Sequence, residues 1–394
     1  MREGWTYKKL GEVCDKSQNI NWNKVSEEKQ YTYIDLSSVD RECLSVINPQ
    51  IINKTNAPSR AKQIVETGDV IFATTRPTLR RTCVIGEDNN GQICSTGFCV
   101  LRPQKQVLAK WIFYNLQYDG FYSYIEPLQT GANYPAVADS VVKDYNIPVP
   151  SLSEQQSIVA ELDKINELIS LKKAQLSDLD SLAQSIFYDM FGDPIENEKG
   201  WEVKKLGDLC NKIGSGATPR GGNESYKNQG ISFIRSMNVY NNEFRCKDLA
   251  FIDEEQADAL SNVVVFPQDI LLNITGASVA RCCIVPDDIL PARVNQHVCI
   301  IRPKSIADSI YLNYMLTNDS YQNHLLSLAR SKAATREALP KSIVENLHIP
   351  LPPLSLQQEF AKRIELIEQQ KAQISSMIKD LETLLASRMQ YWFD

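Results

Sequence analysis

Basic and amide side chains gather in several short polar stretches of this 394-residue sequence. A guanidinium can donate two parallel hydrogen bonds to the O6/N7 edge of guanine, and an asparagine amide matches the N6/N7 edge of adenine. The same groups also hold phosphates or remain solvated, and then they carry no sequence information. The candidates for such contacts are Lys54, Arg60, Lys62, Arg76, Arg80, Arg81, Asn133 and Tyr134 in the first half, and Thr218, Arg220, Arg235, Asn273, Thr275, Arg281, Arg293, Arg330, Lys332 and Arg336 in the second. Among them, Arg76, Asn133 and Arg281 are the strongest candidates for base contact.

Signatures of catalysis and metal binding are missing from the sequence. There is no Asn-Pro-Pro-aromatic or Asp-Pro-Pro-aromatic run for amino methylation, no GxGxxG fingerprint, no CxxC pair, and only three histidines are present. The glycine-rich stretch GSGATPRGG at 214–222 lacks the GK[ST] ending of a phosphate loop. It is interpreted as a surface loop, or as a loop that approaches a nucleic acid. We therefore expect no catalytic residue, no metal ligand and no cofactor on this chain.

The bulk composition indicates a globular protein with two domains. The chain is 43% hydrophobic and 23% charged, and 394 residues exceed one ordinary core. No apolar run reaches the roughly 18 residues that a membrane span needs, and the N-terminus lacks a signal-peptide core. We therefore expect a cytoplasmic protein without membrane contact. The cysteines at matching repeat positions, Cys14/Cys210, Cys83/Cys283 and Cys99/Cys299, are expected to be reduced and packed in the core.

The net charge of −6 lies almost wholly in one segment. Residues 151–200 contain 10 acidic and 4 basic side chains, whereas residues 1–150 contain 16 and 17, and residues 201–350 contain 16 of each. Both large blocks are neutral on average, so local basic faces remain possible. The acidity still leaves open a coiled-coil scaffold that touches no DNA.

The sequence repeats itself with an offset near 200. GWTYKKLGEVC at 4–14 and GWEVKKLGDLC at 200–210 agree at seven of eleven positions, and IPVPSLSEQQ at 147–156 is matched by IPLPPLSLQQ at 349–358. The offset grows from 196 at the first pair to 202 at the second. Anchored segments separated by variable loops are typical of a tandem duplication of one domain.

Residues that are the same in both copies are predicted to be framework. Arg102 and Arg302 occupy the matching CVLRP and CIIRP runs and are expected to serve structure. Trp5 and Trp201 open the two copies. Trp201 is expected to pack at the end of the first long helix, and Trp5 at the end of the second.

Each copy divides into a mixed block and a long helix. Apolar runs at 70–74, 99–101, 270–273 and 298–301, separated by turns, predict twisted sheet, and 109–116 and 309–316 predict short helices. After the Ile-Pro-x-Pro run the apolar period changes to alternating spacings of four and three, which predicts a coiled-coil helix over roughly 153–190 and again after 353. The apolar stripe comprises Ile158, Leu162, Ile165, Ile169, Leu176 and Leu179 in the first helix, and Ile364, Ile367, Ile374, Ile378 and Leu381 in the second.

These elements predict an α+β protein built from a duplicated mixed α/β domain. The domain boundaries are placed at 1–150 for the first mixed domain, 151–194 for the central helix, 195–352 for the second mixed domain and 353–394 for the C-terminal helix. An exposed apolar stripe needs a partner, so the two helices are expected to pair as an antiparallel coiled coil with pseudo-two-fold symmetry. A parallel pair, which would bring both mixed blocks to one end, is the alternative. Ser153 and Ser355 are the expected N-caps.

The repeated motifs resemble the specificity subunit of type I restriction–modification enzymes. The resemblance rests on GWxxKKLGxxC, on GSGATP at 214–219, on IPxPxLSxQQ and on MFGDP at 190–194, and it covers essentially the whole chain twice. It implies two target-recognition domains, which read a bipartite DNA sequence, and helices that set the spacer. It also implies double-stranded DNA and two methyltransferase subunits as partners, with two restriction subunits possible in addition. S-adenosylmethionine would then be bound by the methyltransferase, and ATP with Mg²⁺ by the restriction subunit.

The two copies differ where they are expected to read DNA. Copy two has KIGSGATPR at 212–220 where copy one has DKSQNINWN at 15–23, and Gly276 in copy two stands where copy one has Arg76. An asymmetric target is therefore expected. A specificity-like subunit of another DNA-defence or DNA-modification assembly remains an alternative, beside the scaffold.

Overall fold

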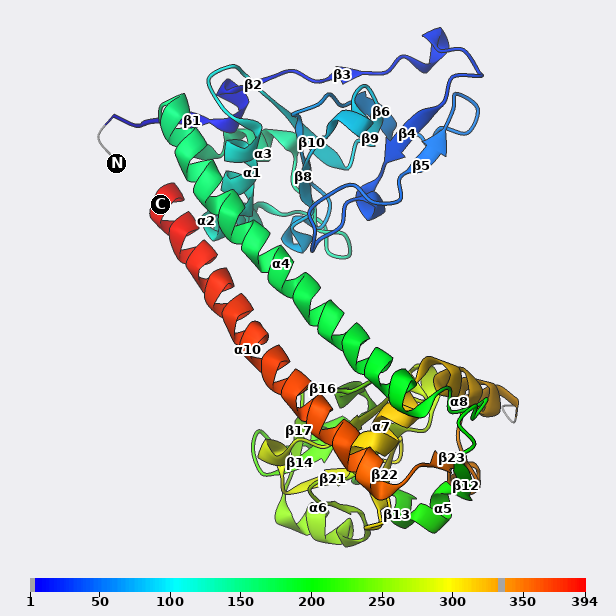
Figure 1. Cartoon of the computed structure of the whole chain (residues 1–394). Helices are drawn as coiled ribbons and strands as arrows, with labels where there is room; N and C mark the ends of the chain where they lie inside the picture. The colour runs from blue at the N-terminus through cyan, green and yellow to red at the C-terminus, as the bar shows by residue number, and fades with distance from the viewer. Residues whose placement is uncertain (1–3, 332–336) are drawn as a thin grey trace. The chain divides into compact units, whose positions relative to one another are not determined.

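The chain forms two compact units, each of which contains parts of both copies. The computed structural model describes residues 4–331 and 337–394. One unit comprises Met1–Lys173 with Ser376–Asp394, and the other comprises Ala174–Ser375. Each unit therefore holds one mixed domain, the beginning of the long helix that follows this domain, and the end of the other long helix (Figure 1).

The first mixed domain is built on two sheets and one short ladder. One sheet is antiparallel with the strand order β2-β10-β7-β8, and the second has the order β3-β6-β9-β4-β5 with β4 and β9 parallel. The ladder pairs β1 with β11 and so brings the opening phrase onto the Ile-Pro-x-Pro run. The strands are β1 (Thr6–Lys9), β2 (Cys14–Asp15), β3 (Gln18–Asn19), β4 (Tyr31–Ile34), β5 (Gln50–Ile52), β6 (Ala61–Ile64), β7 (Val70–Ala73), β8 (Thr82–Val84), β9 (Ile93–Ser95), β10 (Phe98–Pro103) and β11 (Asn146–Val149), and the helices are α1 (Ala109–Gln117), α2 (Asp119–Ile125) and α3 (Asp139–Asp144).

The second mixed domain repeats this plan. Its antiparallel sheet has the order β13-β22-β19-β20, its second sheet has the order β17-β14-β21-β18 with β14 and β21 parallel, and β12 pairs with β23. An added hairpin joins β15 to β16. The strands are β12 (Glu202–Lys205), β13 (Cys210–Ser215), β14 (Ile231–Ile234), β15 (Val239–Tyr240), β16 (Glu243–Phe244), β17 (Ala250–Ile252), β18 (Val264–Val265), β19 (Ile270–Asn273), β20 (Cys282–Ile284), β21 (Ala292–Val294), β22 (Val298–Pro303) and β23 (His348–Leu351), and the helices are α5 (Leu206–Leu209), α6 (Glu254–Ala259), α7 (Ser309–Thr317), α8 (Asp319–Ser331) and α9 (Lys341–Glu345).

The predicted strands and helices of both mixed domains are confirmed. The runs at 70–74 and 270–273 form β7 and β19, whose four residues are all buried because helices or a second sheet cover both faces. The cysteines are all free, and burial raises the pKa of matched thiols such as Cys83 and Cys283 to about 12. No helix in the described part of the chain is long and apolar enough to cross a membrane.

The long helices are α4 (Leu152–Phe191) and α10 (Leu354–Phe393), each of 40 residues. At 1.5 Å per residue, such a helix is about 60 Å long. The predicted cap at Ser153 is wrong by two positions, because Ser151 and Glu154 exchange hydrogen bonds at the start of α4 in a capping box. The predicted cap Ser355 likewise lies inside the first turn of α10. In both copies a proline-rich extended segment leads directly into the helix.

Within each unit the two helices run antiparallel, as predicted. In the first unit Glu161, near the start of α4, accepts hydrogen bonds from Arg388 and Trp392 near the end of α10. In the second unit Lys371 pairs with Asp180 at 2.8 Å. Of the predicted stripe, Leu176 and Leu381 are half-buried and the other residues are buried.

Trp5 and Trp201 both lie where a helix ends. Trp5 stacks on Trp392 with ring centroids 6.3 Å apart and an interplanar angle of 12°. Trp201 donates its indole N–H to the carbonyl of Phe191, at the last residue of α4, at 2.9 Å. The prediction that both open a copy against a helix end is confirmed, and the first unit is thereby closed by residues from opposite ends of the sequence.

Candidate nucleic-acid interface

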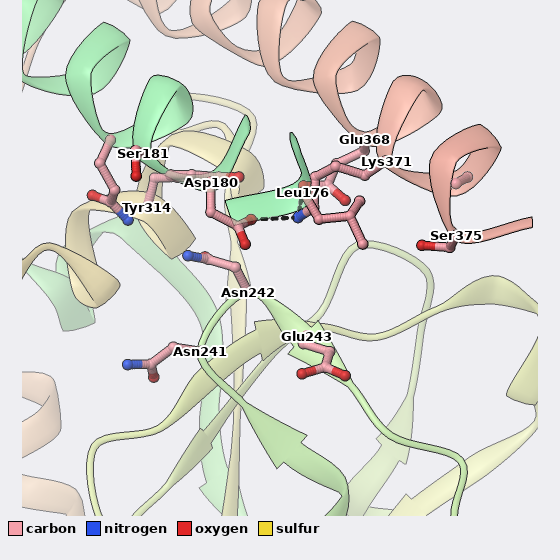
Figure 2. Close-up of a pocket in the computed structure, with 12 residues that line it drawn as sticks. Leu176, Asp180, Ser181, Asn241, Asn242, Glu243, Tyr314, Glu368, Lys371 and Ser375 are labelled. Atoms are coloured by element: carbon pink, nitrogen blue, oxygen red, sulfur yellow. Dashed lines mark hydrogen bonds and ion pairs between the residues drawn. The ribbon is translucent and has the colours of Figure 1, made fainter. Parts of the chain in front are cut away.

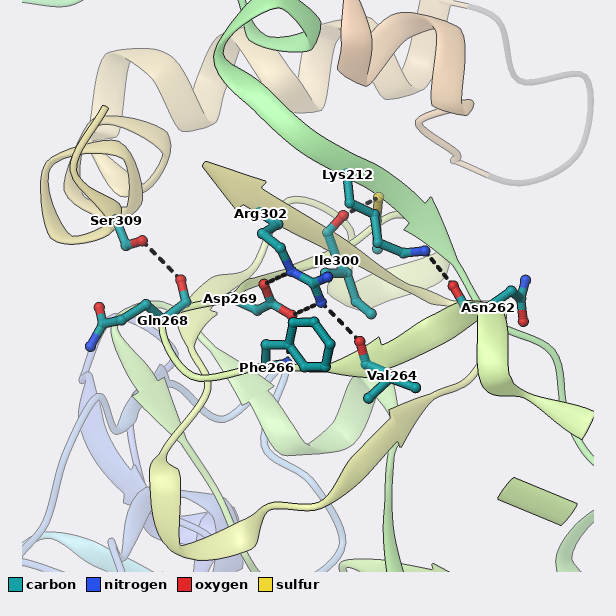
Figure 3. A network of polar contacts seen from close by, with 10 residues as sticks. Lys212, Asn262, Val264, Phe266, Gln268, Asp269, Ile300, Arg302 and Ser309 are labelled. Atoms are coloured by element: carbon teal, nitrogen blue, oxygen red, sulfur yellow. Dashed lines mark hydrogen bonds and ion pairs between the residues drawn. The ribbon is translucent and has the colours of Figure 1, made fainter. Parts of the chain in front are cut away.

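A bidentate arginine–aspartate pair fixes the same turn in both mixed domains. Arg302 donates from Nε and Nη2 to the two carboxylate oxygens of Asp269, at 2.7 Å each, and from Nη2 to the carbonyl of Val264 (Figure 3). Asp269 also accepts from the backbone N–H of Phe266. Arg102 and Asp69 form the same pair in the first domain, at 2.9 and 2.8 Å. The predicted structural role of Arg102 and Arg302 is confirmed.

A second set of matched contacts joins each long helix to its own domain. Gln155 and Gln357 are fully buried; each accepts a hydrogen bond from the backbone N–H just before a short helix and donates to a carbonyl of the proline run. Trp111 and Tyr311 occupy matched sites and donate to the carbonyls of Pro148 and Pro350. The helices are therefore fixed to a framework that both copies share.

The loop after β7 carries Arg76 to the surface of the first domain. Its guanidinium lies 4.7 Å from the ring centroid of Tyr134, and its backbone N–H donates to the carbonyl of Pro135 at 2.7 Å. A bridge between Thr75 and Ala136 holds the two loops together. The structure thus brings Arg76 and Tyr134 together from segments about 60 residues apart, with Asn133 next to them in an exposed position.

The neighbouring arginines have partners within the fold. Arg80 forms an ion pair with Asp119 and lies over the ring of Tyr122. Arg81 donates to the backbone carbonyls of Leu36 and Val39. Arg81 is therefore a structural residue in this conformation. Of the other basic candidates in this domain, Arg60 and Lys62 are exposed and Lys54 is half-buried.

The second domain forms a groove of about 500 Å³ at the matching place. Arg281 lies along it with its guanidinium 4.4 Å from the ring centroid of Tyr240, and Arg245 covers that ring at 3.6 Å. Thr275 Oγ1 lies 2.5 Å from Nδ1 of His297, which also lines the groove. Arg281, Tyr240 and His297 therefore line the groove together with Glu337, while Arg245 lies over the Tyr240 ring, is not part of the lining and pairs with Glu243. A guanidinium and an imidazole in one groove are groups that can form hydrogen bonds with base edges.

The glycine-rich stretch is only partly a loop. Gly214 and Ser215 belong to β13, and a Cβ atom at Gly216 would lie 1.8 Å from the carbonyl oxygen of Val294. A close backbone approach therefore explains this glycine. Beyond it, Thr218 donates to the side chain of Gln296, and Arg220 is exposed.

Two candidates of the second domain are buried, and a third is half-buried. Asn273 is fully buried and donates to the carbonyls of Ser236 and Val239. Arg293 is 9% exposed, donates to the carbonyl of Ala257, and has its pKa lowered by burial. Arg235 donates to the carbonyl of Asp248. The buried positions of Asn273 and Arg293 do not suit base contact, whereas Arg235 is half-buried and its Nε has no hydrogen-bond partner among the described residues.

Of the remaining candidates, Arg330 lies near the end of α8. Arg330 pairs with Glu337 at 2.9 Å and is exposed. Lys332 and Arg336 lie outside the described residues.

A cleft of about 660 Å³ separates the β15–β16 turn from the helices of the second unit. Lys371 lies between Asp180 and Glu368, at 2.8 Å from each, while Asn241, Asn242 and Glu243 line the opposite side (Figure 2). Burial would lower the pKa of Lys371, but the hydrogen bonds to both carboxylates raise it above the ordinary value. The acidic lining does not suit DNA.

Sequence reasoning missed two groove residues. Tyr240 and His297 were not among the candidates, and neither was Arg245, which lies over the Tyr240 ring. The pattern VYNNEF at 239–244, with an Asn-Asn turn between apolar residues, is a hairpin signal that could have placed Tyr240 at a turn. No pattern in the sequence brings this hairpin to Arg281.

Comparison with known proteins identifies the class of this chain. Residues 2–180 and 198–382 each match the type I restriction modification DNA specificity domain. The chain therefore belongs to this family and carries its domain twice.

Specificity subunits of type I restriction enzymes are among its relatives. The MjaIX specificity subunit of Methanocaldococcus jannaschii is 28% identical over 287 residues, which cover 68% of this chain and 64% of the relative. The putative MjaX specificity subunit of the same organism is 21% identical over 416 residues, covering 97% and 93%. A solved structure from work on complex assembly in a type I R-M system has a TM-score of 0.63 and 26% identity, covering 99% and 97%. The chain thus spans just under two thirds of the first relative and nearly all of the other two.

Proposed function

We propose that this chain is the non-catalytic DNA-recognition subunit of a type I restriction–modification complex. Each mixed domain reads one part of an asymmetric, bipartite target, and the paired helices set the length of the unread spacer. Membership in the specificity family supports the recognition role.

The proposal of an asymmetric target rests on the difference between the matched loops of the two domains. The framework is the same in both domains, including the Arg–Asp pair and the buried glutamine. The loops attached to it differ, since the first domain presents Arg76 on Tyr134, and the second presents Arg281, Tyr240 and His297. Because the same scaffold presents different exposed side chains in the two domains, we expect the two half-sites to have different sequences.

The proposed partners are double-stranded DNA and two methyltransferase subunits, with restriction subunits joining a complete complex in the cytoplasm. S-adenosylmethionine would be held by the methyltransferase, and ATP with Mg²⁺ by the restriction subunit. Neutral recognition domains favour a complex in which the partners provide much of the phosphate contact, because the salt-dependent part of DNA affinity scales with the phosphates that are neutralised.

Exchange of one recognition domain tests this function. Methylome sequencing of cells carrying the complex reports its target, and replacing residues 15–145 with the matching segment of another specificity subunit should change one half-site only. The unmodified chain is the control. A changed sequence in both half-sites, or a wild-type complex that selects no sequence, would contradict the proposal.

A further inference from the structure

The backbone at Arg76 has a shape that normally belongs to glycine. Arg76 has φ 50° and ψ 56°, in the left-handed region, and it directly precedes Pro77. A side chain raises the energy of this region, and a following proline disfavours helical angles further. The structurally matched residue of the second domain is Gly276, with φ 75°.

The two loops are otherwise built alike. The N–H of Arg76 donates to the carbonyl of Pro135, and the N–H of Gly276 donates to the carbonyl of Glu337. The residue four positions on also has a positive φ in both copies, with Arg80 at 55° and Ala280 at 72°. The loop shape therefore does not depend on the arginine side chain. An arginine at this position adds strain that the fold does not need, and such strain is typical of functional sites.

The side chain of Arg76 contacts an aromatic ring, but its hydrogen-bond donors remain available. It is exposed and stacks on the ring of Tyr134, which is itself 68% exposed. Within the described residues, no carboxylate pairs with this guanidinium and no carbonyl accepts its side-chain N–H groups. By contrast, Arg80 forms an ion pair with Asp119, and Arg81 donates to the carbonyls of Leu36 and Val39. Stacking fixes the plane of a guanidinium and leaves its donor edge free.

We propose that Arg76, oriented by Tyr134, reads a guanine of the half-site bound by the first domain. This proposal rests on the proposed function and adds the base and the residue that selects it. A planar fork with two parallel donors matches the O6 and N7 acceptors of guanine in the major groove. A phosphate contact would require neither a fixed plane nor a strained backbone, since phosphate accepts from many directions.

Two substitutions of Arg76 separate these roles. R76G copies the second domain and relieves the strained angle, whereas R76K keeps the charge but loses the fork. The methyltransferase complex is reconstituted with each chain, and competition binding compares the wild-type target with duplexes in which each G·C pair is replaced. Thermal unfolding confirms that each variant is folded.

Both variants should lose discrimination at one G·C pair, by about 10- to 100-fold, and at no position of the other half-site. Y134A should weaken the same discrimination, and Y134F should preserve it because the ring remains. The half-site of the first domain is identified independently by exchange of residues 15–145.

Three results would overturn the proposal. Unchanged discrimination in R76G is one. The second is a set of results typical of a phosphate contact. R76G would then bind all sequences more weakly to the same extent, with its salt slope reduced by about one, and R76K would bind like the wild type. A first half-site that contains no G·C pair is the third. In each of these cases a wild-type complex that still selects a bipartite sequence leaves the proposed function intact.

Discussion

The Arg–Asp pairs hold a turn in each domain, and the pair of the second domain is not part of the groove lining. Asp269 is fully buried, and its carboxylate accepts from Arg302 and from the N–H of Phe266. The guanidinium of Arg302 is also covered by the ring of Phe266 at 3.9 Å. The pair therefore stabilises the turn between β18 and β19, next to the sheet that supports the groove.

Asp269→Asn should destabilise the second domain by about 2–3 kcal/mol, because it leaves a half-buried guanidinium without its bidentate acceptor. Urea unfolding of the reconstituted complex measures the loss. The methylated target of the folded fraction should be unchanged. Glu66→Gln is the matched control, since Glu66 is the exposed third partner of Arg102. An altered half-site in Asp269→Asn would assign this pair a reading role instead.

Repetition separated framework residues from candidate reading residues in the sequence, but it did not indicate burial. Arg102 and Arg302 were predicted to be structural because both copies carry them, and Arg76 stood out because its partner is Gly276. Asn273 and Arg293 were weaker candidates, but nothing in the sequence excluded them. Their burial depends on which strands pack over them, and this is set by contacts between segments distant in sequence.

Contacts between the long helices have a polar component at the end of α10. Arg388 donates to both carboxylate oxygens of Glu161, and Trp392 donates to the same group at 3.2 Å. The hydrogen bond from Arg388 lowers the pKa of Glu161 below its ordinary value of 4.5, although burial opposes this. A lowered carboxyl pKa contributes stability above the ordinary value, and this contribution is lost as the pH falls through the folded-state pKa.

Glu161→Gln should therefore lower the melting temperature at pH 7, and the difference from the unmodified chain should shrink as the pH falls below about 4.5. Thermal unfolding in a pH series checks both statements. Glu167→Gln serves as the control, because Glu167 is exposed and its nearest cation, Lys164, is 3.8 Å away. A difference that stays constant from pH 7 to pH 4 would show that packing, rather than charge, accounts for the effect.

The helices were the most predictable elements, because a heptad pattern without glycine or proline determines both their extent and their buried face. The predicted range 153–190 differs from α4 by one residue at each end. The apolar stripes predicted that the helices pair, and the similarity between the segment after the first helix and the start of the sequence favoured the antiparallel over the parallel direction. The β15–β16 hairpin was not predicted, since its strands have only two residues each.

As a molecule, the chain is one domain plan used twice, with each long helix shared between two units. The unit boundaries fall at Lys173 in α4 and at Ser375 in α10. Length added at these two points changes neither mixed domain and preserves the contacts within each unit.

Inserting one heptad after Lys173 and another after Ser375 should keep the apolar stripes in phase and lengthen both helices by about 10 Å. At 3.4 Å per base pair this corresponds to about three base pairs. Methylome sequencing should then show the same half-sites separated by a spacer about three base pairs longer. Replacing seven residues at each point, without insertion, is the control. An unchanged spacer would show that the helices do not determine the separation.

The completion of the first unit by residues 376–394 also has a consequence for biosynthesis. Trp111 packs against Phe393 with ring centroids 5.0 Å apart, and Trp5 stacks on Trp392. These partners leave the ribosome more than 200 residues after the first domain, which is a delay of roughly 10–45 s at 5–20 residues per second. During that time the nascent domain exposes an aromatic surface, so we expect it to depend on chaperones until synthesis reaches the end of α10.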